Sequence, residues 1–333
     1  MNFLLSCIST RHSMLKKHWV QTKDETQCPV TVLGNLRPSQ STAEVAVRGS
    51  LEKPNEDQGG LLCLLNENGE ALEQIELPMP AGMTFSDQGV LVASIEEVNE
   101  VAPDLSTIQR NVVSLPTFNM LHSLSRSSRG YLVASTGVDA ILEFTRSGEL
   151  LWSWWATEHG FEYTPKGERR VLDMNGDYRG TKFGTLAQTT HVNSVAELPD
   201  GTVLATLFHQ GMVIRIERED GSWQPVLEGL DHPHSVRILA DNYFTVADTG
   251  RGRGLMVNIK DGKGRIEAEV DAQTNWLQDC AYDQHHDNWI LVDGKNSHVT
   301  LRAGLTGERP IRRFDLDPEW RLYEILPLDG LAS

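Results

Sequence analysis

The chain has 333 residues, of which 39% are hydrophobic and 28 are glycine, and its formal net charge is −16 with a pI near 5.1. Such an acidic surface repels nucleic acid and anionic membrane, so we expect neither as a partner. The length suits two average domains or one closed all-β ring. Because no linker divides it, we predict a single domain over residues 1–333.

The chain begins with MNFLLSCIST, which has a short apolar core and no basic residue before it, and therefore makes a poor signal peptide. Elsewhere, no apolar run approaches the ~18 residues that a membrane helix needs. The cysteines Cys7, Cys28, Cys63 and Cys280 show neither a CxxC motif nor framework spacing. We therefore expect buried thiols in a cytoplasmic protein, with a disulfide between Cys7 and Cys63 as the alternative.

After a first strand at residues 2–9, the chain repeats one pattern, which is clearest in residues 190–217, THVNSVAELPDGTVLATLFHQGMVIRIE. A strand leads to a Pro-Asp-Gly turn at residues 199–201, a second strand ends at residues 207–209, and a third strand follows. Similar copies begin at residues 81, 121, 233 and 277. In each copy, a small or acidic residue precedes the first apolar pair and serves as a marker. These markers are Gly82, Ser123, Ser194, Ser235 and Asp279, and they are separated by 41, 71, 41 and 44 residues.

A period near 40 residues, with four short strands in each unit, predicts propeller blades. Fourth strands are expected near residues 147–155, 222–229, 265–272 and 309–316. Residues 320–330 contain a first strand and a turn but no second strand, whereas residues 2–9 look like a second strand without a first. Joined, the two ends complete one blade. We therefore predict an all-β, six-bladed β-propeller of four-stranded antiparallel blades, closed by N- and C-terminal strands that share a blade.

Two insertions interrupt the repeat. One covers about residues 10–58, between the second and third strands of the shared blade, and the other covers residues 157–189, before a first strand. In a four-stranded antiparallel blade, both joints lie on the same face of the ring, opposite the Pro-Asp-Gly turns. Loops elaborated on one face of a rigid ring usually form the walls of a pocket. We expect a small-molecule site on this face, where the insertions could also bind a protein partner.

Histidines are concentrated on the same face. First strands open with the triplets Met120-Leu121-His122, His191-Val192-Asn193, His232-Pro233-His234 and Trp276-Leu277-Gln278. Positions one and three of a strand triplet point the same way, and the innermost strand borders the central channel. The side chains expected at one channel mouth are therefore His122, His191, His232, His234, Asn193 and Gln278. His209, at the end of a second strand, should reach the same rim, as should Arg251 and Arg253.

Imidazoles that converge from adjacent blades could bind a divalent transition metal such as zinc or iron. They could equally serve as nucleophile or general base, while the arginines hold an anion. The assignments are as follows: metal ligands His122, His191, His232 and His234; catalytic residues His191, His234, Arg251 and Arg253; substrate-binding residues Asn193, His209, Gln278 and Asp279. The alternative is that each histidine packs at a strand start and hydrogen-bonds a neighbouring joint. His298, which opens a third strand, is assigned a structural role.

Residues 190–206, together with the corner at His209, resemble the arylsulfotransferase-like family, whose blades carry an H-x-N-S motif before a turn of the PDG type. HPHSVRILADNYFTVADTGRGRG, from residue 232, resembles that family's next blade. The likeness covers blades three to six and implies sulfuryl transfer through a covalent histidine, with His191, His234 and one of Arg251 or Arg253 stabilising the sulfate. Where the family has its nucleophilic histidine, this chain has Trp276-Leu277-Gln278-Asp279.

The repeat also resembles six-bladed propellers of the NHL type. Lyases of that type that act on peptidyl-hydroxyglycine hold a zinc with histidines from separate blades, a role that His122, His191 and His234 would match. The sequence thus favours a small-molecule enzyme with a His-lined site at the channel mouth and metal-assisted lyase or hydrolase chemistry. The alternatives are sulfotransferase-like group transfer and a non-catalytic propeller that binds proteins.

Overall fold

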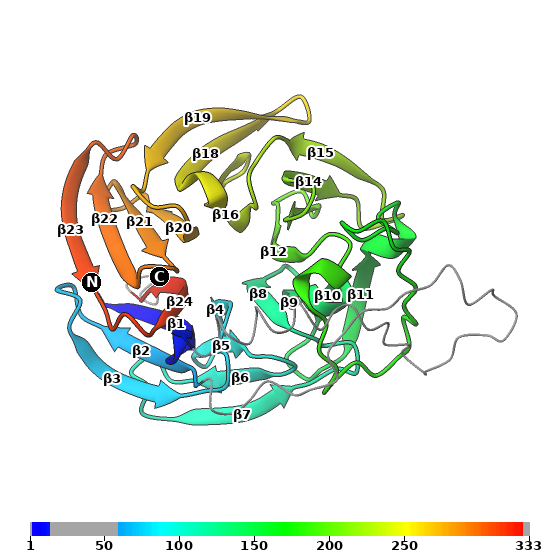
Figure 1. Cartoon of the computed structure of the whole chain (residues 1–333), viewed down its shortest axis with the longest axis horizontal. Helices are drawn as coiled ribbons and strands as arrows, with labels where there is room; N and C mark the ends of the chain where they lie inside the picture. The colour runs from blue at the N-terminus through cyan, green and yellow to red at the C-terminus, as the bar shows by residue number, and fades with distance from the viewer. Residues whose placement is uncertain (1, 14–58, 329–333) are drawn as a thin grey trace, which may run out of the picture.

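The computed structural model describes residues 2–13 and 59–328, and it confirms the predicted propeller. Six four-stranded antiparallel sheets are arranged as blades around a common axis (Figure 1). We number the blades from the one that contains both ends of the chain. Within the described residues, no helix is long and apolar enough to cross a membrane.

The strands of each blade are ordered from the innermost to the outermost. Blade one has β24 (Arg321–Pro327), β1 (Phe3–Ser9), β2 (Leu61–Leu65) and β3 (Ala71–Glu76); blade two has β4 (Met83–Phe85), β5 (Val90–Ala93), β6 (Val98–Val101) and β7 (Ile108–Val113); blade three has β8 (Leu121–Arg126), β9 (Tyr131–Ser135), β10 (Ala140–Phe144) and β11 (Leu150–Trp155). Blade four has β12 (Val192–Glu197), β13 (Val203–Leu207), β14 (Met212–Ile216) and β15 (Trp223–Leu227); blade five has β16 (His234–Ala240), β17 (Tyr243–Asp248), β18 (Arg253–Lys260) and β19 (Lys263–Asp271); blade six has β20 (Leu277–Asp283), β21 (Asn288–Asp293), β22 (His298–Ala303) and β23 (Arg309–Asp315). Short 3-10 helices are η2 (Thr136–Val138), η3 (Ala156–Glu158), η4 (Thr185–Ala187) and η5 (Thr249–Arg251).

Blade one closes the ring as predicted. The C-terminal β24 pairs antiparallel with the N-terminal β1, with Phe3 opposite Pro327 and Leu5 opposite Ile325. The first insertion leaves this blade between β1 and β2, its second and third strands, although residues 14–58 lie outside the described residues. Cys28 falls there too, whereas Cys7, Cys63 and Cys280 are free and buried, which confirms the thiol prediction for these three.

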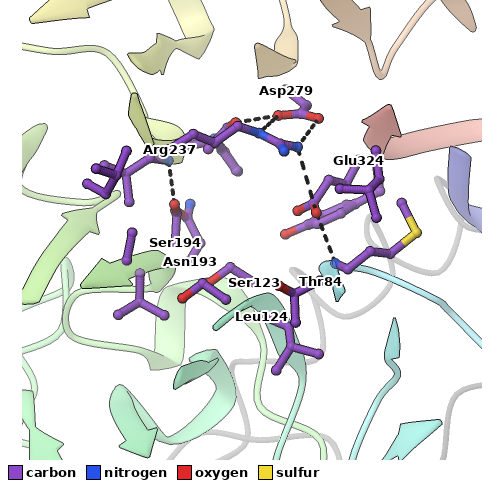
Figure 2. A pocket seen from close by; sticks show the side chains of 18 of the residues that line it. Thr84, Ser123, Leu124, Asn193, Ser194, Arg237, Asp279 and Glu324 are labelled. Atoms are coloured by element: carbon purple, nitrogen blue, oxygen red, sulfur yellow. Dashed lines mark hydrogen bonds and ion pairs between the residues drawn. The ribbon is translucent and has the colours of Figure 1, made fainter. Parts of the chain in front are cut away.

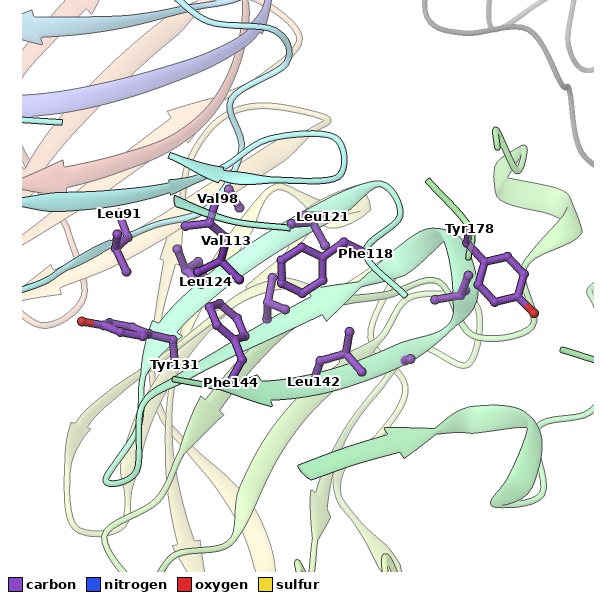
Figure 3. Packing of buried hydrophobic residues seen from close by; sticks show 14 of the residues in the cluster. Leu91, Val98, Val113, Phe118, Leu121, Leu124, Tyr131, Leu142, Phe144 and Tyr178 are labelled. Atoms are coloured by element: carbon purple, nitrogen blue, oxygen red, sulfur yellow. The ribbon is translucent and has the colours of Figure 1, made fainter. Parts of the chain in front are cut away.

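The hydrophobic core is divided among the interfaces between blades. Within the described residues, the buried apolar side chains form six clusters, one at each interface. Figure 3 shows the cluster between blades two and three, where Leu91 and Val98 face Leu124 and Phe144. Each fully buried aliphatic or aromatic side chain contributes roughly 1.5–3 kcal/mol. Apolar contacts between each pair of adjacent blades therefore hold the ring together.

Burial along each blade explains the sequence pattern. The second strands β9, β13 and β21 are buried at every residue because neighbouring blades cover both of their faces. A strand covered on both faces reads as a continuous apolar run. The outermost β3 is exposed at nearly every residue, and polar residues interrupt its sequence, ALEQIE.

The innermost strands carry a repeated irregularity. The pairing register shifts near the start of β8, β12, β16 and β20, for example between Val192 and Ser194 and between Leu277 and Asp279. A β-bulge places an extra residue opposite a single partner and re-aims the side chains beside it. Consecutive residues such as Asn193 and Ser194 can therefore both face the ring axis.

The second insertion, residues 157–189, is fixed to the ring by a buried ion pair. Arg170 from the insertion binds the Asp139 carboxylate, and both side chains are 0% exposed. The same carboxylate accepts hydrogen bonds from the backbone N–H groups of Thr189 and His191, each at 2.7 Å. The insertion therefore reaches the predicted histidine-bearing face and is held there by charge.

Candidate functional site

A cavity of about 250 Å³ lies inside the ring of innermost strands. All six of these strands, β4, β8, β12, β16, β20 and β24, supply residues to its wall. Figure 2 shows Arg237, Asp279 and Glu324 across an open space from Ser123 and Asn193. Pockets for drug-sized ligands measure roughly 300–1,000 Å³. This cavity therefore suits a small metabolite.

One side of the cavity is built on an ion pair between blades five and six. Arg237 Nη2 lies 2.8 Å from Asp279 Oδ2, and its Nε lies 3.2 Å from Oδ1. Arg237 also donates to the Ile325 carbonyl at 3.1 Å, and Asp279 Oδ2 accepts from the Ile325 N–H at 2.9 Å. Ser235 Oγ donates to Asp279 as well. The charges are thus mutually compensated and tie the inner strands of blades one, five and six together.

Glu324 on β24 lies beside this pair. Its Oε1 accepts a hydrogen bond from the Met83 N–H at 2.9 Å and stands 3.7 Å from Arg237 Nη2. Burial raises the pKa of Glu324, Arg237 opposes the shift and the Asp279 charge adds to it, which gives a net pKa of about 8. The carboxyl group is therefore protonated at neutral pH and can donate a hydrogen bond. Burial also raises the pKa of its neighbour Tyr323, which remains a neutral phenol.

His234 at the start of β16 is the histidine that lines the cavity. Its Nδ1 lies 2.9 Å from the His232 carbonyl oxygen and 2.9 Å from Thr249 Oγ1. Because a carbonyl can only accept, Nδ1 carries the proton and Nε2 keeps its lone pair. Burial lowers the pKa of His234 to about 3, so the imidazole is neutral at pH 7.

The other predicted histidines pack into an aromatic cluster around Phe208. The ring of Phe208 lies 4.2 Å from that of His232, 4.7 Å from His191 and 5.5 Å from His234, measured between centroids. His122 packs edge-on against His191 at 5.0 Å. Burial lowers the pKa of His122 to about 4 and that of His191 well below 6.5. These imidazoles are therefore neutral as well.

The predicted metal ligands do not form a preformed ligand set, and a metal site at these histidines stays a prediction. Among residues 2–13 and 59–328, no three His, Cys, Asp or Glu side chains are placed to hold a metal ion. The ring of Phe208 packs against both His191 and His234, and His122 packs directly on His191. The predicted set of His122, His191, His232 and His234 therefore comes together as packed aromatic rings.

The first residues of three strand triplets do not have extended backbone. Met120, His191 and His232 precede strands β8, β12 and β16, and they have φ angles of 49°, 49° and 55°. They occupy the left-handed region, so the alternation of a strand does not set their direction. His191 is placed by a hydrogen bond from its Nδ1 to Gln188 Oε1 in the insertion.

The predicted residues therefore divide into two groups. Asn193, Gln278 and Asp279 line the cavity with His234. The remaining six all lie in the described part of the chain but are not among its lining residues: His122, His191, His209, His232, Arg251 and Arg253. His209 donates from Nε2 to the Thr185 carbonyl at 2.9 Å, which places it against the insertion.

Arg251 and Arg253 are paired away from the cavity. Both donate to Asp248 Oδ2, at 3.0 Å from Arg251 Nη1 and 2.6 Å from Arg253 Nη2. Arg253 also binds Glu269 at 2.8 Å. The predicted role of these arginines in holding an anion beside the histidines is therefore not supported by their positions.

Several polar cavity residues were not predicted as site residues from the sequence, among them Arg237, Glu324, Tyr323 and Ser123. For Arg237 a signal existed, because it is a charged residue two positions after the repeat marker Ser235 in an otherwise apolar strand, SVRIL. Glu324 occupies the matching strand of the shared blade, in LYEIL. Aligning the inner strands by column, in addition to their opening triplets, would have found both.

Comparison with known proteins supports the fold. No protein-family model matches the sequence, and no curated protein matches it. Among solved structures, the nidogen/laminin complex is 12% identical, covers 80% of this chain and 94% of that chain, and has a TM-score of 0.57. A periplasmic gluconolactonase from Pseudomonas aeruginosa is 12% identical with a TM-score of 0.52, covering 80% and 94%. A virginiamycin B lyase from Staphylococcus aureus is 17% identical with a TM-score of 0.47, covering 73% and 72%. For the first two structures, with TM-scores above 0.5, the likeness is one of fold alone.

Proposed function

We propose that this protein is an enzyme that acts on a small molecule in the central cavity, with His234 as proton acceptor and Glu324 as proton donor. One observation carries the proposal: both groups line the same cavity in uncharged forms at neutral pH. In water a carboxyl group loses its proton at a lower pH than an imidazolium does. Here burial inverts that order, so the carboxyl group keeps a proton to give and the imidazole keeps a lone pair to accept one.

Hydrolysis and elimination are the reaction classes that suit this pair. In hydrolysis, His234 Nε2 accepts a proton from water, the water oxygen attacks a carbonyl carbon, and Glu324 protonates the leaving oxygen. In elimination, His234 removes a proton from the carbon beside a carbonyl, and Glu324 protonates the departing group. Either reaction creates an imidazolium and a carboxylate together, and their opposite charges stabilise one another inside the cavity.

The other two enzyme hypotheses receive less support. Metal-assisted chemistry has no preformed ligand set within the described ranges. Sulfotransferase-like chemistry lacks its anion-binding arginines, which are paired with Asp248. The gluconolactonase that shares the fold makes lactones the first compounds to assay, as an analogy of fold only.

The test is an assay of sugar lactones, aryl acetates and β-hydroxy carbonyl compounds with the wild type, His234→Gln and Glu324→Gln. We expect each substitution to lower kcat by roughly 100- to 10,000-fold. The wild-type rate should fall as the pH rises above about 8, where Glu324 loses its proton. Thr245→Val, a buried change on β17 outside the cavity wall, is the control. Full activity in either variant, or no turnover of any compound by the wild type, would contradict the proposal.

A further inference from the structure

The charges around the cavity are balanced by partners. Each side chain that carries a full charge in the cavity wall is bound to an oppositely charged group; the pairs are Arg237 with Asp279 at 2.8 Å, Glu197 with Arg218 at 2.8 Å and Arg126 with Asp87 at 2.9 Å. Glu324, the remaining carboxyl group, is 3.7 Å from Arg237. An ion that entered would lose its hydration without meeting an uncompensated opposite charge.

Hydrogen-bond donors remain free in the same wall. Gln278 Oε1 accepts from Trp276 Nε1 at 2.9 Å, which leaves the Gln278 amide nitrogen to donate. Asn193 Oδ1 accepts from Thr206 Oγ1 at 2.6 Å, and its Nδ2 is buried without a partner in the described part of the chain. Asn193 is only 2% exposed. A buried donor with no acceptor destabilises the fold, so these groups indicate a ligand that supplies acceptors.

Two hydroxyl groups on β8 extend this unsatisfied surface. Ser123 Oγ and Ser125 Oγ are buried and have no partner among the described residues, and both serines line the cavity. Figure 2 shows Ser123 and Asn193 at the edge of the same space as Glu324. Blades three and four thus each present at least one donor across from the compensated ion pair, and Gln278 of blade six supplies another beside it.

We infer that the cavity selects an uncharged, oxygen-rich ligand of the polyol or cyclic sugar-alcohol class, whose oxygens accept hydrogen bonds from Asn193, Gln278 and the β8 serines. About 250 Å³ equals the liquid volume of roughly eight waters, enough for a ring with several hydroxyl groups. The inference deepens the proposed function, since it names the substrate class of the same cavity. It rests on the paired charges and the unpartnered hydrogen-bond donors of the cavity wall. Measurements of ligand binding, without any turnover, can therefore test it.

The first experiment compares three probes of matched size by titration calorimetry at pH 7: neutral 1,5-anhydroglucitol, anionic gluconate and cationic glucamine. We expect the neutral probe to bind at least about tenfold more tightly than either ion. An ion would lose its hydration in the cavity without gaining an ion pair. Equal or tighter binding of either ion would overturn the inference. So would the absence of measurable binding of the neutral probe.

A second experiment separates ligand binding from stability. Ser125→Ala removes a buried hydroxyl that has no partner in the described ranges, so its Tm should equal or exceed that of the wild type, while the Kd for 1,5-anhydroglucitol rises roughly two- to tenfold. Thr245→Val is the matched control, because Thr245 Oγ1 is also buried and unpartnered there but lies outside the cavity wall. It should leave the Kd unchanged. An unchanged Kd in Ser125→Ala would count against the inference.

The proposed ligand class and the proposed acid–base reaction can be rejected independently of each other. Selective binding of the neutral probe with no turnover of any lactone or ester would reject the acid–base proposal and keep the ligand class. Turnover that depends on His234 and Glu324 but prefers a charged substrate would keep the enzyme and reject the ligand class.

Discussion

Replacing Arg170 with methionine tests whether the second insertion is fixed to the ring by charge. The Arg170 guanidinium and the Asp139 carboxylate are both 0% exposed, so the substitution leaves a buried carboxylate without its cation. Breaking a buried ion pair by removing one partner costs about 3–5 kcal/mol. The backbone donors of Thr189 and His191 still reach Asp139, which places our expectation at the lower end of that range.

The expected change in Tm follows from chain length. At ~2.1 cal/mol/K per residue, 333 residues give an unfolding entropy of about 0.7 kcal/mol/K, so 3–5 kcal/mol lowers the Tm by about 4–7 °C. Differential scanning calorimetry measures this. Arg126→Met is the matched control, since Arg126 and its partner Asp87 are 58% and 78% exposed and such pairs contribute at most about 1 kcal/mol. An Arg170→Met Tm within about 1 °C of the control would refute the reasoning.

Three further predictions concern protons and metals. Because folding lowers the pKa of His234 to about 3 and that of His122 to about 4, the unfolded chain binds more protons than the folded chain between those values and pH 6.5. Stability should therefore fall as the pH falls below about 6.5, by up to roughly 1.4 kcal/mol per pH unit for each histidine, and urea unfolding at pH 7 and pH 5 measures the loss. Glu324 has the opposite effect, because its pKa is raised to about 8 by folding, so its contribution to folding stability is lost as the pH rises through that value. Glu324→Gln should therefore gain stability relative to the wild type between pH 5 and pH 9. A constant difference in stability between the two proteins would contradict this. Elemental analysis of untagged protein should find less than one transition metal per chain because no three ligating side chains of the described residues form a preformed set, whereas one equivalent that is lost in His122→Ala would support the metal hypothesis.

The fold could be predicted from the sequence because its determinants are local and repeated. Each blade carries its own turn and its own apolar second strand, and the period near 40 residues is visible without any knowledge of contacts. The shared blade could be predicted because the C-terminal segment lacks a second strand and the N-terminal segment lacks a first strand. Even the polar stretch after Ser94, which lacks a clear strand pattern, forms β6 and β7.

The site could be predicted only in part, because its residues are set by features that a strand pattern does not contain. The bulge beside Val192 lets Asn193 and Ser194 both line the cavity, and the left-handed backbone at His191 and His232 places these two residues outside strand alternation. Arg237 pairs with Asp279 in the next blade, across 42 residues of sequence. Nothing in either local segment specifies that contact.

The shared blade also sets the order in which the cavity can be made. Tyr323 and Glu324 lie on β24, the last of the 24 strands in the described part of the chain, and this strand pairs with β1, the first. A chain emerging from the ribosome can pack blades two to six in sequence, since each contacts mainly its neighbour. The proton donor of the proposed reaction arrives only with the final strand. The cavity is therefore complete only after the ring has closed. A chain that has not yet added β24 lacks the residues that this strand contributes to the cavity wall.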